Sequence, residues 1–170
     1  MKRLVETLDR LPRERLAELV SAACYGTVLV LAALSVIGVS EVALGHGAEL
    51  VAGVGFATWL AHIFAELLGG HARHPEPLHR SEVVRAVVDG SPILASTVLP
   101  AIVLLFGRLD LLSDSSARIL AILLAIIQLF GIGALVARVA PAPPATSWTF
   151  AAATASIGIA VVALTVFLGH

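Results

Sequence analysis

The sequence predicts an all-α membrane protein, and three observations lead to this fold class: composition, hydropathy and the length of the apolar runs. The chain has 170 residues, of which 58% are hydrophobic and only 14% are charged. Its mean hydropathy of +0.96 is far above that of a soluble domain of this length. Apolar runs of about 20 residues can cross a bilayer as helices. Five occur, at 20–40, 49–70, 91–107, 118–138 and 148–168.

The distribution of basic residues predicts the orientation of these five transmembrane helices. Nine of the eleven Lys and Arg residues fall on one side of the predicted membrane: Lys2, Arg3, Arg10, Arg13, Arg15, Arg73, Arg80, Arg85 and Arg138. Only Arg108 and Arg118 fall on the other side. Cytoplasmic loops carry the excess of basic residues in membrane proteins. We therefore expect a multi-pass protein of the cell membrane, with its N-terminus inside and its C-terminus outside.

Residues 1–19 precede the first apolar run and mix leucines with charged side chains. This pattern is typical of an amphipathic segment that lies on a membrane surface, and Pro12 should interrupt or restart its helix. The run at 20–40 is too long for a cleavable signal, so we expect it to remain as an anchor. The chain thus divides into a cytoplasmic interfacial segment at 1–19 and a transmembrane domain at 20–170.

The second apolar run carries the two residues that point most strongly to function, His62 and Glu66. Ionisable groups are costly in hydrocarbon and persist where they face protein or a water-filled cavity. On a helix, the four-residue separation brings the imidazole and the carboxylate onto one face. Because imidazole changes charge near neutral pH, the pair is interpreted as a titrating unit in an ion pathway, with a purely structural hydrogen bond as the alternative.

Small side chains recur every four residues along the same run and form a row beside the polar face. The row consists of Gly53, Ala57, Ala61, Ala65 and Gly69. Small residues allow the backbones of two membrane helices to approach closely. The row therefore predicts a close helix contact, either within the protomer or across a homodimer.

One sizeable polar loop joins the second and third runs, at residues 71–90. Pro75 and Pro77 prevent a regular helix at its start, whereas Ser81 and Glu82 suit the opening of a short helix. Three histidines also lie in this loop, at His71, His74 and His79. Their spacing matches no metal-ligand motif, so a solvated loop is the simpler interpretation.

The last three runs contain few polar groups. Pro100 lies within the third run and should kink its helix, because proline has no N–H to donate. The fourth run contains Gln128, whose amide is predicted to line an ion pathway or to form a hydrogen bond between helices. The fifth run is rich in small residues and is predicted to pack against other helices.

The motifs of soluble enzymes are missing from the sequence. It has no Gly-rich phosphate loop, no C-x-x-C pair, no H-E-x-x-H and no nucleophile elbow. We therefore expect neither an enzyme nor a nucleic-acid-binding protein. No cofactor is predicted with certainty, and a divalent metal ion is considered as a transported substrate that His62 and Glu66 would bind.

The layout resembles the vacuolar iron transporter family, which has five transmembrane helices, a cytoplasmic N-terminus and its main cytoplasmic insertion between the second and third helices. Three segments are similar to that family's last three helices: SPILASTVLPAIVLLFG, GALVARVAPAP and TASIGIAVVALTVFLG. Tyr25 and Gly26 are similar to the aromatic-glycine pair that opens its first-helix motif. The resemblance implies a homodimer with a pathway between the two copies.

The metal-binding residues of that family are not retained here. Leu29 stands where the family's first helix has an aspartate, and ATWLAHIFAELLG replaces a Ser-Met-Ala-x-Gly-Glu-Tyr motif. The loop at 71–90 is also too short for the family's helical metal-binding domain. Iron transport therefore does not carry over. The sequence predicts transport of a small cation, a proton or a divalent metal, and the alternative is a non-transporting membrane scaffold that binds a partner.

Overall fold

A computed structural model describes residues 12–73, 77, 79–139 and 144–168 of the chain, and the regular secondary structure of this part is all helical, with no strand. The helices are α2 (Arg13–Val36), α3 (Val39–Ala43), α4 (His46–Arg73), α5 (Arg80–Asp89), α6 (Ser91–Arg108), α7 (Asp114–Val139) and α8 (Pro144–Leu168). The all-α prediction is confirmed. Each of the five predicted runs lies largely within one long helix: α2, α4, α6, α7 or α8.

Four helical segments are long and apolar enough to cross a membrane. They are Arg13–Val36, His46–Arg73, Arg80–Arg108 and Asp114–Ala137. The third combines α5 and α6. Within the described part of α8, the apolar helix Ala152–Leu164 is shorter than a full span. The protein is thus a helical membrane protein with four candidate spans, and the fifth span and the orientation stay predictions.

Local signals in the sequence explain where several helices begin. Pro12 precedes α2, and its carbonyl accepts the first helical hydrogen bond, from the N–H of Leu16 at 3.0 Å. Helix α2 begins directly after Pro12, and residues 13–19 are continuous with the first span; the predicted amphipathic segment before Pro12, residues 1–11, lies outside the described part of the chain. Ser113 precedes α7, and its Oγ accepts a hydrogen bond from the N–H of Ser116 at 3.2 Å.

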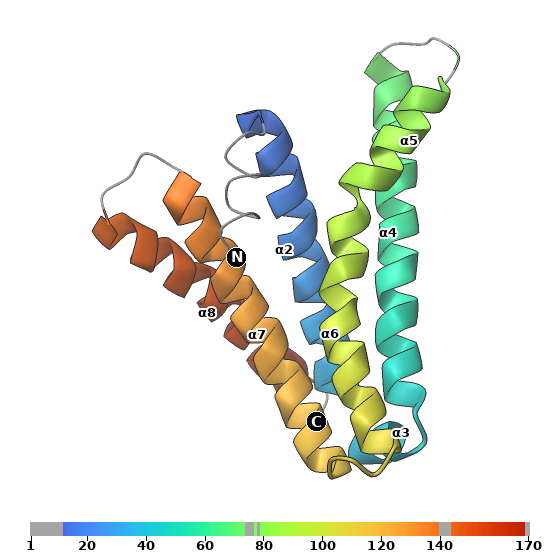
Figure 1. Ribbon diagram of the computed structural model, residues 1–170, viewed down its shortest axis with the longest axis vertical. Helices are drawn as coiled ribbons and strands as arrows, with labels where there is room; N and C mark the ends of the chain where they lie inside the picture. Colours follow the sequence, from blue (N-terminus) through green and yellow to red (C-terminus); the bar gives the residue numbers. More distant parts are fainter. Residues whose placement is uncertain (1–11, 74–76, 78, 140–143, 169–170) are drawn as a thin grey trace.

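The predicted short helix in the polar loop is present as α5. Its first residue is Arg80, one residue before the predicted opening at Ser81. The N–H of His79 donates to Glu82 Oε2 at 2.9 Å, which satisfies a backbone donor at the start of the helix. Helix α5 ends at Asp89, and after Gly90 the chain continues as α6 in a new direction (Figure 1).

The long helices converge at one end of the molecule and separate at the other (Figure 1). The converging end contains α3 and the connection from α6 to α7. Helices α4 and α6 lie side by side, α7 packs against α8, and α2 contacts all four. The starts of α2 and α5 and the end of α4 lie at the separated end.

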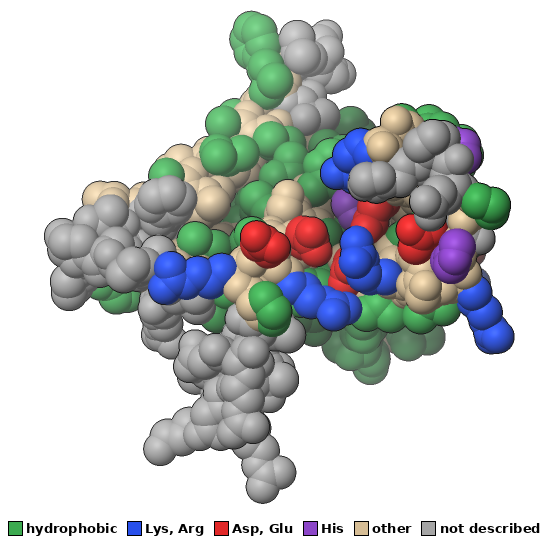
Figure 2. All heavy atoms as spheres, turned by 90° about the horizontal axis from the view of Figure 1, so that it is seen from above, with side chains coloured by type: hydrophobic (Ala, Val, Ile, Leu, Met, Phe, Trp, Pro, Cys, Tyr) green, Lys and Arg blue, Asp and Glu red, His purple; other side chains and the backbone are tan. Residues whose placement is uncertain are grey.

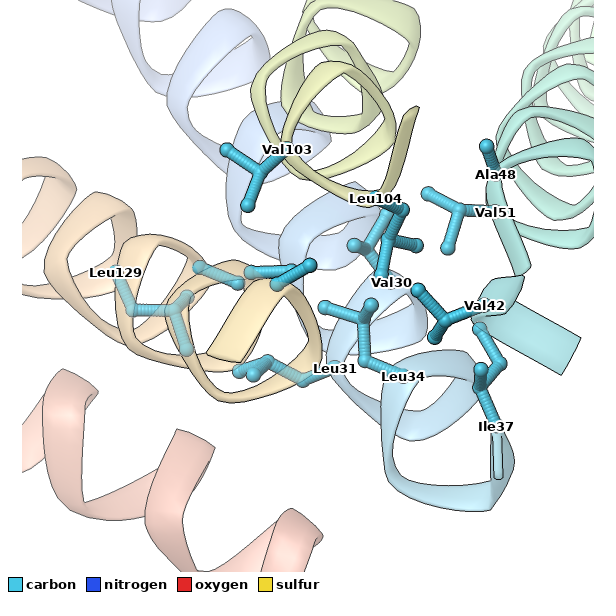
Figure 3. Close-up of a cluster of buried hydrophobic side chains, with 13 residues drawn as sticks. Val30, Leu31, Leu34, Ile37, Val42, Ala48, Val51, Val103, Leu104 and Leu129 are labelled. Atoms are coloured by element: carbon cyan, nitrogen blue, oxygen red, sulfur yellow. The ribbon is translucent and has the colours of Figure 1, made fainter. Parts of the chain in front are cut away.

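The hydrophobic core occupies the converging half of the bundle (Figure 3). Leu31 and Leu34 of α2 are fully buried there, against Val42 of α3 and Leu104 of α6. Helix α7 contributes small residues at four-residue spacing, namely Ala117, Ala121 and Ala125. Between membrane helices, van der Waals packing replaces the hydrophobic driving force. This half of the bundle is therefore tightly packed and apolar, and we refer to it below as the apolar seal.

Two glycines permit close helix approaches within the protomer. A Cβ added at Gly26 of α2 would lie 2.9 Å from the Cα of Ile93, and one added at Gly55 of α4 would overlap the side chain of Thr97. The predicted row behaves differently: Gly53 faces open space and Ala57 is exposed. The close contact of α4 within the protomer thus uses Gly55 instead of the row. A contact of the row across a homodimer stays a prediction.

Helix α8 packs within the protomer through Gly158, whereas its aligned small residues Ala152, Ser156 and Ala160, on which the packing prediction rests, are exposed. A Cβ added at Gly158 would lie 2.7 Å from Leu129 Cδ1 of α7 and 3.0 Å from Leu31 Cδ1 of α2. The glycine lets α8 settle against both helices at the edge of the core. Gly158 thereby brings α8 into contact with the buried cluster of the converging half.

Candidate functional site

His62 faces a groove between α2 and α4. The groove has a volume of about 420 Å³ and is lined by Ser21, Ala22, Tyr25, Thr58, Ala61, His62 and Ala65. Three of these residues carry hydroxyl groups. The only imidazole deep within a predicted span therefore opens toward a partly polar space. A histidine in this setting can exchange a proton or accept a cation.

Glu66 lies one helical turn beyond His62, on the side of the separated end. Both side chains are half-buried, and the four-residue spacing sets them on neighbouring parts of one helix face, as predicted. Within the part of the chain that the structure describes, neither side chain has a hydrogen bond or an ion pair with the other. Glu66 is also outside the groove lining. The pair is adjacent without being bonded.

The row of small residues enters the groove at its middle. On a helix, each step of four residues turns by about 40°, so such a row winds slowly around the axis. Gly53 and Ala57 consequently face outward, whereas Ala61 and Ala65 line the groove beside His62. The predicted packing residues thus divide between the outer face of α4 and the candidate site.

The joint between α5 and α6, formed by Asp89 and Gly90, packs against His62. A Cβ added at Gly90 would lie 3.2 Å from His62 Cδ2 and 3.1 Å from Trp59 Cδ1. The indole Nε1 of Trp59 donates a hydrogen bond to the carbonyl of Val87 at 3.4 Å. The absence of a side chain at Gly90 therefore lets the joint rest directly on the imidazole and the indole.

Asp89 is the residue at this joint that sequence reasoning missed. Its side chain is only 5% exposed, and its Oδ1 lies 3.2 Å from the Nη2 atom of Arg15 in α2. Arg85 Nε lies 4.0 Å from Oδ2. A carboxylate in the last turn of a helix opposes the helix dipole. That unfavourable position in α5 was the available signal that Asp89 has a basic partner elsewhere.

Charged side chains gather at the separated end of the bundle. Figure 2 looks onto this end and shows basic, acidic and histidine side chains close together. Basic residues of this end include Arg13 and Arg15 of α2, Arg73 of α4, and Arg80 and Arg85 of α5. These basic residues lie at the same end of the molecule because α2 and α5 begin where α4 ends (Figure 1).

Gln128 lies in a different pocket from His62. This second pocket has a volume of about 320 Å³ and is bounded by α2, α6 and α7. Helix α2 contributes Ala23 and Thr27 here, but Ser21 and Tyr25 to the His62 groove. Residues offset by two positions point to opposite faces of a helix. The three residues predicted to share an ion pathway are therefore not brought together.

No cluster of three or more His, Cys, Asp or Glu side chains suited to a metal ion occurs among the described residues. Of the loop histidines, His79 precedes α5, with its Nδ1 2.8 Å from the carbonyl of Pro77. His74 lies outside the described residues. A resident metal would thus have at most two ligands of these types among the described residues, so a divalent metal is considered only as a transported substrate.

Comparison with known proteins finds no matching family model, no matching curated protein and no matching solved structure. The resemblance to the vacuolar iron transporter family stays a prediction carried by the short segments quoted above. A functional interpretation of this chain therefore rests on its own residues and geometry.

Proposed function

We propose that this protein transports a small cation across the cell membrane, with His62 as the residue that receives the ion. One observation carries the proposal: His62 is an ionisable side chain inside an apolar span, and it faces a groove with three hydroxyl-bearing residues. Ionisable groups held at this depth are functional candidates by default, because inserting them costs free energy that packing alone does not recover.

The chemistry of the groove suits a proton or a divalent metal. A neutral imidazole accepts a proton or donates its lone pair to a metal. Ser21, Tyr25 and Thr58 supply oxygen atoms along the groove, and Glu66, one turn nearer the separated end, supplies negative charge. Cations entering from that end would meet the carboxylate first and the imidazole second.

The asymmetry of the bundle supports access from one side at a time. Both pockets lie between helices outside the apolar seal, which fills the converging half. We propose that the separated end faces the cytoplasm and that five spans place the C-terminus outside, as the basic residues predict. In this orientation the groove lies on the cytoplasmic side of the seal, and transport requires a movement that parts the seal.

A flux measurement on purified protein in liposomes tests the proposal. We expect the wild type to carry protons, read with an internal pH-sensitive dye, or a divalent metal, read with an internal metal-sensitive dye. His62→Ala should abolish the flux, and Glu66→Gln should reduce it by removing the negative charge. His46→Ala is the matched control, because His46 is an exposed histidine at the first residue of α4, in the converging half.

Wild-type flux that survives both His62→Ala and Glu66→Gln would contradict the role of the pair, provided that both variants insert and remain folded. A wild type that carries neither protons nor metals would favour the second candidate function, a scaffold. The exposed positions of Gly53 and Ala57 support that candidate, because a helix can approach closely there. Gly53→Leu should then disrupt a homodimer or a complex with a partner.

A further inference from the structure

The pocket around Gln128 collects polar groups from three helices in a largely apolar setting. Thr27 of α2, Ser96 of α6 and Gln128 of α7 line it, and most of the remaining lining is aliphatic. Its volume of about 320 Å³ lies in the range of small-molecule sites, which are typically apolar with a few convergent polar groups. None of its lining residues is ionisable.

Both hydroxyl protons in the pocket are already in use. Thr27 Oγ1 donates to the carbonyl of Ala23 at 2.7 Å, and Ser96 Oγ donates to the carbonyl of Ile93 at 2.6 Å. A hydroxyl that donates to its own helix retains lone pairs but has no proton left for another partner. Neither residue can therefore donate a hydrogen bond to the Gln128 amide.

The amide of Gln128 has no hydrogen-bond partner among the described residues, and its Oε1 is fully buried. An unsatisfied buried polar group is energetically unfavourable. Turning the amide over exchanges its oxygen and nitrogen with little change in shape. In either orientation, the accessible end of the amide can pair with a molecule in the pocket that can both donate and accept.

We propose that this pocket binds an uncharged molecule that carries a hydroxyl group on an apolar body. The hydroxyl both donates and accepts, so it pairs with the Gln128 amide in either orientation. The apolar body matches the aliphatic lining. A charged ligand is disfavoured, because the pocket offers no opposite charge to offset its desolvation. This site lies on the opposite face of α2 from His62 and is independent of cation transport.

The composition of the chain makes the Gln128 side chain a specific NMR probe of this pocket. Gln128 is the only glutamine in the chain, and the chain has no asparagine. The protein labelled with ¹⁵N and ¹³C glutamine in phosphatidylcholine nanodiscs therefore has one side-chain carboxamide to observe by NMR. Titration with 1-octanol should shift the Gln128 Nε2 and Cδ resonances and should saturate. Titration with n-nonane, a matched hydrocarbon without a hydroxyl, should not.

A pocket-filling variant keeps the probe in place. A Cβ added at Gly131 meets no atom within 4 Å, so Gly131→Leu should fold while its side chain occupies the pocket. This variant should lose the saturable shift. Gly70→Leu is the matched control: Gly70 is equally open but lies on α4, outside this pocket, so the shift should persist.

Two sources of the ligand are distinguished by a second titration, in which diacylglycerol replaces part of the phosphatidylcholine. A saturable shift identifies a hydroxyl-bearing lipid as a ligand, whereas a response to 1-octanol alone identifies a free alcohol. The proposal is overturned if octanol produces only a non-saturating drift, if nonane produces the same shift, or if Gly131→Leu leaves the shift unchanged.

Discussion

Asp89 is held at the joint between α5 and α6 by arginines of two different helices. Because the carboxylate is almost fully buried while Arg15 is 44% exposed, the two partners are not equivalent. Removing Arg15 leaves a buried charge with only Arg85 at 4.0 Å, whereas neutralising Asp89 leaves an arginine that water can solvate. A buried charge without its partner is strongly destabilising.

We therefore expect Arg15→Ala to lower the free energy of unfolding by about 1–3 kcal/mol. Asp89→Asn should cost less, and the double variant should be less destabilised than the sum of the two. Thermal unfolding in detergent, analysed as a double-mutant cycle, measures this coupling. Arg80→Ala, at an exposed arginine of the same end, is the control and should have little effect. Strictly additive changes would show that the ion pair contributes nothing.

At the level of single residues, the sequence predicts which residues are functional candidates better than it predicts their contacts in the fold. His62 was predicted to be a functional candidate because an ionisable group in an apolar run is conspicuous. Its neighbours Tyr25 and Gly90 could not be predicted, since spacing along one helix says nothing of how that helix is rotated against others. The partner of Asp89 lies 74 residues away, beyond the reach of any local pattern.

Two tight helix contacts differ in how they respond to added volume. At Gly55 of α4 the obstacle is the Cγ2 methyl group of Thr97 on α6, whereas at Gly26 of α2 the obstacles include the backbone of Ile93. A side chain can be shortened by mutation, but a backbone can only move. The first contact is therefore expected to be repairable and the second is not.

Gly55→Ala should destabilise the protein by about 1–3 kcal/mol, the usual cost of overpacking. Adding Thr97→Ser, which removes the obstructing methyl group, should restore much of the loss. Gly53→Ala is the control and should be nearly neutral, because a Cβ there meets no atom within 4 Å. Chemical or thermal unfolding of the four proteins gives the comparison. Failure of Thr97→Ser to rescue Gly55→Ala would contradict the contact.

At the level of helices, the long apolar runs determined what the sequence could predict. Each run became most of a helix, with ends displaced by several residues because capping and not hydropathy sets them. The short helix α3 (Val39–Ala43) was not predicted, since five residues carry little periodicity. The row on α4 was predicted as one face, but its winding divides it between the outer surface and the His62 groove.

The whole molecule has two unlike halves, and this asymmetry was not visible in the sequence. Apolar residues fill every span, so hydropathy alone cannot indicate which half is tightly packed. Small residues determine which half is tightly packed. In the converging half, the helices are brought together by Gly47, Ala48, Ala117, Ala121 and Gly158. At the other end the helices separate, and His62 and Gln128 face the two pockets between them.

Water access to the groove from a single side is the requirement that cation transport through His62 imposes on the whole molecule. Ala61→Cys in a Cys24→Ala background supplies a thiol beside the imidazole, since Ala61 lines the groove. Leu60→Cys is the matched control, because Leu60 is 53% exposed on the outer face of the same helix turn and lies outside the groove. A thiol must ionise in water to react with a maleimide.

Labelling of these two variants with a membrane-impermeant maleimide, applied to intact cells and to inverted vesicles, gives the most direct measurement. We predict that Ala61→Cys reacts in inverted vesicles, where the cytoplasmic side is accessible, and not in intact cells. Leu60→Cys should react in neither. Reaction of Ala61→Cys only from outside would reverse the orientation, and no reaction from either side in the folded protein would contradict a water-filled groove at His62.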